Sequence, residues 1–93
     1  MKDRIKRIAY MEALFDDIKI AIRKSHMSIF DESIKKKIDI LLDYYDNGQW
    51  LKDYEADEAG LIPKDIKRGV LSQDGVYDLI SEIENIKKAP GVD

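Results

Sequence analysis

The 93-residue chain contains no cysteine. This absence excludes disulfides, thiol catalysis and every zinc or iron–sulfur site that uses cysteine ligands. The single histidine, His26, has no acidic or nucleophilic residue at a spacing typical of a catalytic triad or a zinc site. The five glycines are never spaced as in a phosphate-binding or dinucleotide-binding loop. We therefore predict no catalytic residue and no cofactor.

The sequence also lacks long apolar runs and an excess of basic residues. No uninterrupted apolar stretch is long enough for a signal peptide or a membrane span. The formal net charge is −3, which disfavours nucleic acid as the main partner because phosphates must be neutralised by basic residues. The concentrated basic run outside the N-terminus, Lys35-Lys36-Lys37, is typical of a solvated helix face. We therefore expect a cytoplasmic protein that binds neither nucleic acid nor membranes.

Apolar residues recur at three- and four-residue steps in three stretches, the pattern of amphipathic α-helices. The first stretch runs from Ile5 to Ile22, the second from Phe30 to Tyr45, and the last from Val76 to Ile86. No segment alternates apolar and polar residues as a strand does. A chain of this length suffices for one small domain. The sequence predicts a single all-α domain, residues 1–93, built as a small helical bundle.

The connection between the first two helical stretches has two interpretations. Ser28 followed by Asp31 resembles a capping box, which favours a turn near residues 25–30 and an antiparallel helical hairpin. Alternatively, the four-residue step continues through His26 and one helix of about 65 Å runs through, at about 1.5 Å per residue. Such a rod would need a second copy of the chain to cover it. We favour the hairpin.

Turn residues divide the second half of the chain. Gly48 ends the second helix, and a short acidic and aromatic helix is expected from Gln49 to a stop at Gly60. A proline at a first helical position then predicts a single helical turn from Pro63 to Arg68. Ser72 is the predicted N-cap of the last helix.

Carboxylates of the short helix are expected to lie against its apolar side. On a helical wheel Asp57 falls about 20° from Trp50, Asp53 lies at the edge of that face, and Glu58 lies just past Tyr54. A buried charge without a partner would be costly. Because Asp53 and Asp57 are one turn apart, the alternative is an oxygen-rich site for Mg²⁺ or Mn²⁺ that also uses Glu58.

Basic residues follow the short helix within a dozen positions and are the expected partners of these carboxylates: Lys64, Lys67 and Arg68. Arg68 is the best suited to a bidentate pair. We predict that Asp57, Arg68 and a tyrosine hydroxyl form a structural latch between the short helix and the turn that follows it.

Five amphipathic rings fall within 34 residues: Tyr44, Tyr45, Trp50, Tyr54 and Tyr77. Tyrosine and tryptophan are enriched where proteins dock, because each buries a large area and keeps a polar end. Together with Asp57, Lys67 and Arg68, these rings define the predicted interaction or structural network. We expect a non-enzymatic interaction or scaffold module whose partner is another protein or a second copy of the chain. The alternative is a site for a metal or small ligand on Asp53, Asp57 and Glu58.

Two motifs in this block are specific: Asp57-Glu58-Ala59-Gly60, and Lys67-Arg68-Gly69-Val70-Leu71-Ser72. With Tyr44-Tyr45, Trp50 and Asp53-Tyr54 before them, they make the chain similar to domain of unknown function 4298, a family of small bacterial proteins. The resemblance implies a bacterial, cytoplasmic, helical protein. It implies no activity, cofactor or catalytic residue.

Overall fold

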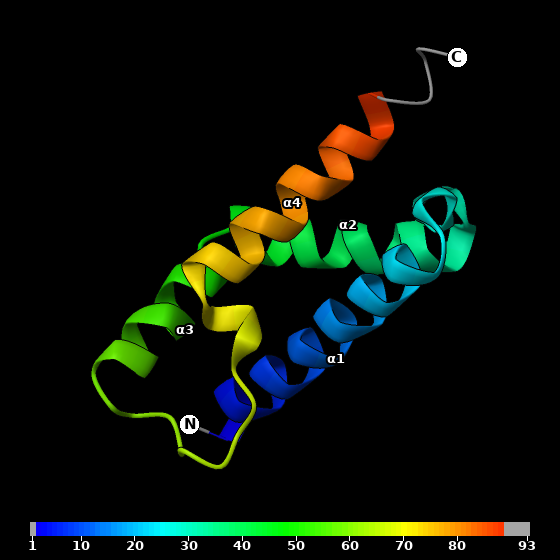
Figure 1. Ribbon diagram of the computed structural model, residues 1–93. Helices are drawn as coiled ribbons and strands as arrows, with labels where there is room; N and C mark the ends of the chain where they lie inside the picture. Colours follow the sequence, from blue (N-terminus) through cyan, green and yellow to red (C-terminus); the bar gives the residue numbers. More distant parts are fainter. Residues whose placement is uncertain (1, 89–93) are drawn as a thin grey trace.

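The computed structural model describes residues 2–88, and all regular secondary structure in that range is helical (Figure 1). The all-α prediction is therefore confirmed. The helices, with two short 3₁₀ turns between them, are α1 (Lys2–Lys24), η1 (His26–Phe30), α2 (Glu32–Asp46), α3 (Gln49–Glu58), η2 (Gly69–Leu71) and α4 (Gln73–Lys88). Within this range, no helix combines the length and apolarity needed to cross a membrane.

The first two helices form the predicted hairpin, with α2 returning along α1 (Figure 1). The turn begins earlier than the capping box predicted: the Ser25 hydroxyl accepts a bond from Met27 N at 3.3 Å. Ser28 does not cap a helix, and its buried hydroxyl has no hydrogen-bond partner among the described residues. The 3₁₀ turn instead brings Ile29 into the core, where only 1% of it is exposed. Burial of this side chain explains why the chain does not continue as one rod.

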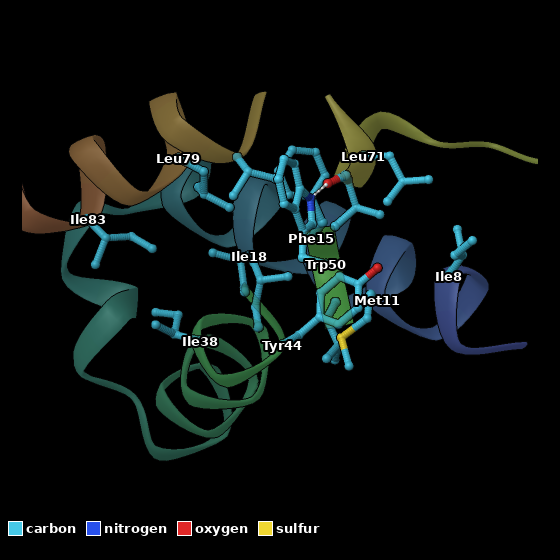
Figure 2. Packing of buried hydrophobic residues seen from close by; sticks show 14 of the residues in the cluster. Ile8, Met11, Phe15, Ile18, Ile38, Tyr44, Trp50, Leu71, Leu79 and Ile83 are labelled. Carbon is cyan, nitrogen blue, oxygen red and sulfur yellow. Dashed lines mark hydrogen bonds between the residues drawn. The ribbon is translucent and has the colours of Figure 1, made fainter. Parts of the chain in front are cut away.

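The core forms where the four helices and the segment before α4 meet (Figure 2). The predicted stripes of α1 and α4 face the core and most of their residues are buried, Ile18 and Ile83 among them, whereas Ile5 and Ile80 are half-buried. The prediction for the second apolar stretch was wrong at both ends, since Phe30, the last residue of η1, is 45% exposed and Tyr45 of α2 is 37% exposed. Tyr44 takes the inward position, with 1% exposed. The hydroxyl of this buried ring donates to the Asp53 carboxylate at 2.7 Å.

Glycine governs the two ends of α3. Gly48 has a φ of +93° and precedes the helix, while Asn47 Oδ1 accepts a bond from Gln49 N at 2.9 Å. Gly60 has a φ of +76° just beyond the end of the helix. Side chains rarely adopt this left-handed backbone, so glycine suits both turns. The predicted limits of the short helix are thereby confirmed.

Residues 59–71, called the strap here, connect α3 to α4 and pass alongside α1 (Figure 1). The predicted helical turn at 63–68 was wrong: one bond of 3.3 Å joins Ile66 N to Pro63 O, and the helical turn lies later, at η2. The open path lets Ile62 and Val70, eight residues apart, both reach the core. The predicted N-cap of α4 is present, because the Ser72 hydroxyl accepts a bond from Gly75 N at 3.2 Å.

Candidate functional site

A carboxylate lies buried at the junction of three helices. Asp53 of α3 has no exposed surface and accepts hydrogen bonds from two helices at once. From α1, Arg7 donates through Nη2 at 2.6 Å and Nε at 2.9 Å, and Arg4 donates through Nε at 3.2 Å. From α2, the Tyr44 hydroxyl donates at 2.7 Å. These four residues are called the Asp53 cluster.

The cluster keeps its charged groups charged. Burial alone would raise the pKa of Asp53, but hydrogen bonds from Arg7 and Tyr44 and the charges of Arg7 and Arg4 lower it. Burial and the hydrogen bond to Asp53 raise the pKa of Tyr44, so its hydroxyl stays protonated as a donor. The same carboxylate raises the pKa of Arg7. The cluster is thus an ion pair with a neutral donor attached.

The sequence analysis did not find these partners. It expected cations from the strap to neutralise the acids of α3, whereas Arg4 and Arg7 lie 49 and 46 residues before Asp53. A local signal exists: the two arginines are three residues apart, so they project from one side of α1, and each immediately precedes a stripe residue, Ile5 or Ile8. Nothing in that spacing indicates which acid they meet.

The ion pair predicted between Asp57 and Arg68 is present and joins α3 to the strap. Its carboxylate lies nearer the surface than that of Asp53, since the side chain of Asp57 is 23% exposed and that of Asp53 is fully buried. The tyrosine hydroxyl expected in this latch instead belongs to the Asp53 cluster. Lys67 bonds to Asp16 of α1 at 3.4 Å and so does not join the latch.

The backbone of Val70 is held from both sides. Trp50 Nε1 donates to Val70 O at 2.8 Å (Figure 2), and Val70 N donates to the buried Glu12 carboxylate at 2.7 Å. The strap passes so close to Glu12 that a Cβ atom added at Gly69 would lie 3.3 Å from Glu12 Oε2. These contacts fix the strap between α1 and α3 and position Arg68 two residues earlier.

The five rings do not form one exposed surface. Tyr44 and Trp50 are buried, whereas Tyr77 is 67% exposed on α4. Trp50 lies between two neighbours: Tyr54 stacks on it with an interplanar angle of 15°, and Tyr45 tilts by 53°, both with centroids 5.0 Å away. Tyr45, Trp50 and Tyr54 are called the aromatic row.

The aromatic row leads into a polar groove of about 410 Å³ between α3 and the start of α4. Three carboxylates and one guanidinium face it, so its charge is negative. Hydrogen bonding to Glu58, followed by burial and the charges of Glu58 and Asp57, raises the pKa of Tyr54 in its wall. The residues lining this α3–α4 groove are Tyr54, Asp57, Glu58, Arg68, Leu71, Ser72, Gln73 and Asp74.

The predicted alternative, a metal site on three carboxylates, does not form. Asp53 faces two guanidiniums inside the protein and Asp57 pairs with Arg68. Of the three carboxylates, Glu58 alone has no basic partner at ion-pair distance among the described residues. Within residues 2–88 no three histidine or acidic side chains are arranged to hold a metal ion. Carboxylates one turn apart on α3 diverge because they pair with opposite neighbours.

The fold and the buried cluster define an all-helical domain in which α1, α2 and α3 are tied at one buried carboxylate. The sequence profile of the domain of unknown function DUF4298 matches residues 8–89, and the chain belongs to this family. The resemblance stated from the motifs is confirmed. No curated protein and no solved structure matches the chain.

Proposed function

We propose that this protein is a non-enzymatic interaction module that holds a basic segment of a partner protein in the α3–α4 groove. The observation that carries the proposal is the charge of the groove. Asp57, Glu58 and Asp74 face it, and Arg68 is the single cation among its lining residues. Arg68 is already paired with Asp57. Glu58 and Asp74 therefore remain to attract a lysine or arginine side chain.

The aromatic row supports the same partner chemistry. Tyr54 lines the groove and stacks on Trp50, which holds the phenol ring in a fixed orientation. A cation placed over a tyrosine ring is attracted by about 0.5–1 kcal/mol at an exposed site. Tyr54 is the ring of the row that lines the groove, so the apolar part of a lysine or arginine side chain can lie against it.

A partner protein fits the groove better than a second copy of this chain. The basic run of the chain itself is at the start of α2, and Lys37 in that run is paired with Asp17 of α1 at 2.9 Å. A contact between this run and the groove of another copy would join two different surfaces. A closed pair would have to bring both surfaces of each copy together at once, and a head-to-tail contact would instead form rings or open chains. We therefore assign the groove to a different protein.

The test is an NMR titration of the protein with a short oligoarginine peptide. Binding is expected to shift the amide signals of Tyr54, Glu58 and Asp74 and to weaken with added salt. The double variant Glu58→Gln/Asp74→Asn keeps the shape of the groove and removes two charges. We expect roughly two- to thirtyfold weaker binding, since each of the two exposed pairs contributes about 0.2–1 kcal/mol.

The matched control is Glu82→Gln/Glu84→Gln, which removes the same charge from exposed positions of α4 outside the groove. Equal weakening by both double variants would mean that the peptide responds to net charge alone, and the groove would be rejected. Sedimentation equilibrium tests whether a second copy of the chain occupies the groove instead. A dimer that the groove variant dissociates and the control variant does not would replace the partner protein with a second copy.

A further inference from the structure

Two arginines share one carboxylate oxygen in the Asp53 cluster. Arg4 Nε and Arg7 Nη2 both donate to Asp53 Oδ1, at 3.2 Å and 2.6 Å. Their guanidiniums are therefore held close together although they carry the same charge. Each side chain is partly exposed, 30% for Arg4 and 26% for Arg7. The pair faces the buried carboxylate on one side and solvent on the other.

Asp53 cannot compensate both arginines. One negative charge stands against two positive charges, and the carboxylate already accepts four hydrogen bonds. Among residues 2–88 no other acidic side chain lies within ion-pair distance of Arg4 or Arg7. A guanidinium offers several N–H donors in a fixed fork, of which Arg4 uses one and Arg7 two. The charge of Asp3 also acts on Arg7, but Asp3 forms no ion pair with it. The pair thus keeps N–H donors that no carboxylate of the described residues uses at ion-pair distance.

The position of the two arginines near the start of α1 adds to the positive electrostatic potential around them. Arg4 lies in the first turn of α1, which begins at Lys2 and has 23 residues. The N-terminus of a helix carries a partial positive charge, which favours an anion beside it. Because Asp53 holds both side chains in place, less side-chain freedom is lost when they bind a ligand than at two mobile surface arginines.

We propose that Arg4 and Arg7 form a binding site for a phosphate group. The donors belong to two guanidiniums on different side chains, and a tetrahedral phosphate has enough oxygens to accept from both. A carboxylate has only two acceptor oxygens and one negative charge, whereas a phosphate group has at least three acceptor oxygens and carries up to about two negative charges. This site is separate from the α3–α4 groove and does not depend on the function proposed for the groove.

The direct test follows the arginine side chains of the intact protein by NMR while inorganic phosphate is added at constant ionic strength. The Nε–H signals of Arg4 and Arg7 are expected to shift and saturate together. Arg23, at the last turn of α1, is the internal reference and is expected to stay unchanged. Shifts of Arg23 equal to those of Arg4 and Arg7, or no saturation, would reject the site. Acetate as effective as phosphate would reject the assignment to phosphate.

Variants separate the site from general charge effects. Arg4→Gln leaves the bonds between Arg7 and Asp53 in place and removes the surplus charge, so phosphate affinity should fall roughly tenfold or more. The matched control, Lys6→Gln, removes the same charge from an exposed position on α1, and its affinity should change by at most about twofold. Equal losses would overturn the proposal. Arg4→Lys, which keeps the charge and removes the fork, should also bind phosphate more weakly than the unmodified protein.

Discussion

Replacing Asp53 by asparagine tests whether the Asp53 cluster holds α1, α2 and α3 together. The substitution keeps the size of the side chain and removes its charge. Arg4 and Arg7 would then lie beside a neutral amide, and the Tyr44 hydroxyl could still donate to the amide oxygen. Breaking a buried ion pair from one side costs about 3–5 kcal/mol. Since both guanidiniums are about a quarter to a third exposed and can turn toward water, we expect a loss of about 3 kcal/mol.

A loss of this size is measurable and leaves the protein folded. A chain of 93 residues is expected to have a free energy of unfolding of about 5–14 kcal/mol. For a domain of this size, 1 kcal/mol shifts the melting temperature by about 4–8 °C, so Asp53→Asn should lower it by roughly 12–24 °C. Circular dichroism follows the helices. Fluorescence of the single tryptophan, Trp50, reports whether the junction of α3 with the strap unfolds in the same transition.

The matched control is Asp57→Asn, the same substitution one turn later on α3. The pair of Asp57 with Arg68 is partly exposed, and exposed pairs contribute about 0.2–1 kcal/mol. We therefore expect at most about 1 kcal/mol for Asp57→Asn. If the two variants lost the same stability, or if Asp53→Asn were as stable as the unmodified protein, the claim that the buried Asp53 cluster stabilises the fold more than the Asp57–Arg68 pair would be refuted.

Three further predictions concern stability. The urea concentration at the unfolding midpoint should decrease when the pH is lowered below about 4, because folding lowers the pKa of Asp53 and the unfolded chain takes up the proton first. It should also decrease when the pH is raised above about 10, because folding raises the pKa of Tyr44 and the unfolded chain loses the proton first. A midpoint that stays level through both limits would contradict these shifts. Glu12→Ala should lower the free energy of unfolding by about 1–3 kcal/mol in chemical denaturation, since it leaves the Val70 N–H unpaired. Glu12→Gln keeps an acceptor and should lower it by less than about 1 kcal/mol. Equal losses in the two variants would show that the bond to Val70 is unimportant. Gly48→Ala should lower stability by about 1–2 kcal/mol, because the φ of +93° is unfavourable for a side chain, and an unchanged melting temperature would refute this.

Buried polar groups carry much of the specificity of this small core. Glu12, Tyr44, Trp50 and Asp53 each place a polar atom inside the protein, and each of these atoms has a partner on a different element. An unpaired buried group costs about 1–3 kcal/mol, so alternative packings that separate these partners are disfavoured. We infer that the apolar stripes drive collapse while these bonds select one arrangement of the helices.

The sequence by itself determined the features that depend on neighbouring residues. The three- and four-residue steps of apolar side chains predicted the stripes of α1 and α4, because a helix repeats every 3.6 residues whatever it packs against. Gly48 and Ser72 marked the starts of α3 and α4, since a left-handed turn and an N-cap are local conformations. The Asp57–Arg68 pair was within reach of the same reasoning, because its two residues are only 11 positions apart in the chain.

Only the tertiary structure decided which polar groups are buried and what they meet. A helical wheel could not distinguish Asp53 from Asp57, because both lie near the apolar side of α3 and the choice depends on how α3 is rotated against α1. It could not choose between Tyr44 and Tyr45 for the same reason. The partners of Asp53 come from a helix that is 46 and 49 residues away in the chain. Such pairings arise from the packing of whole helices, which periodicity along one segment does not encode.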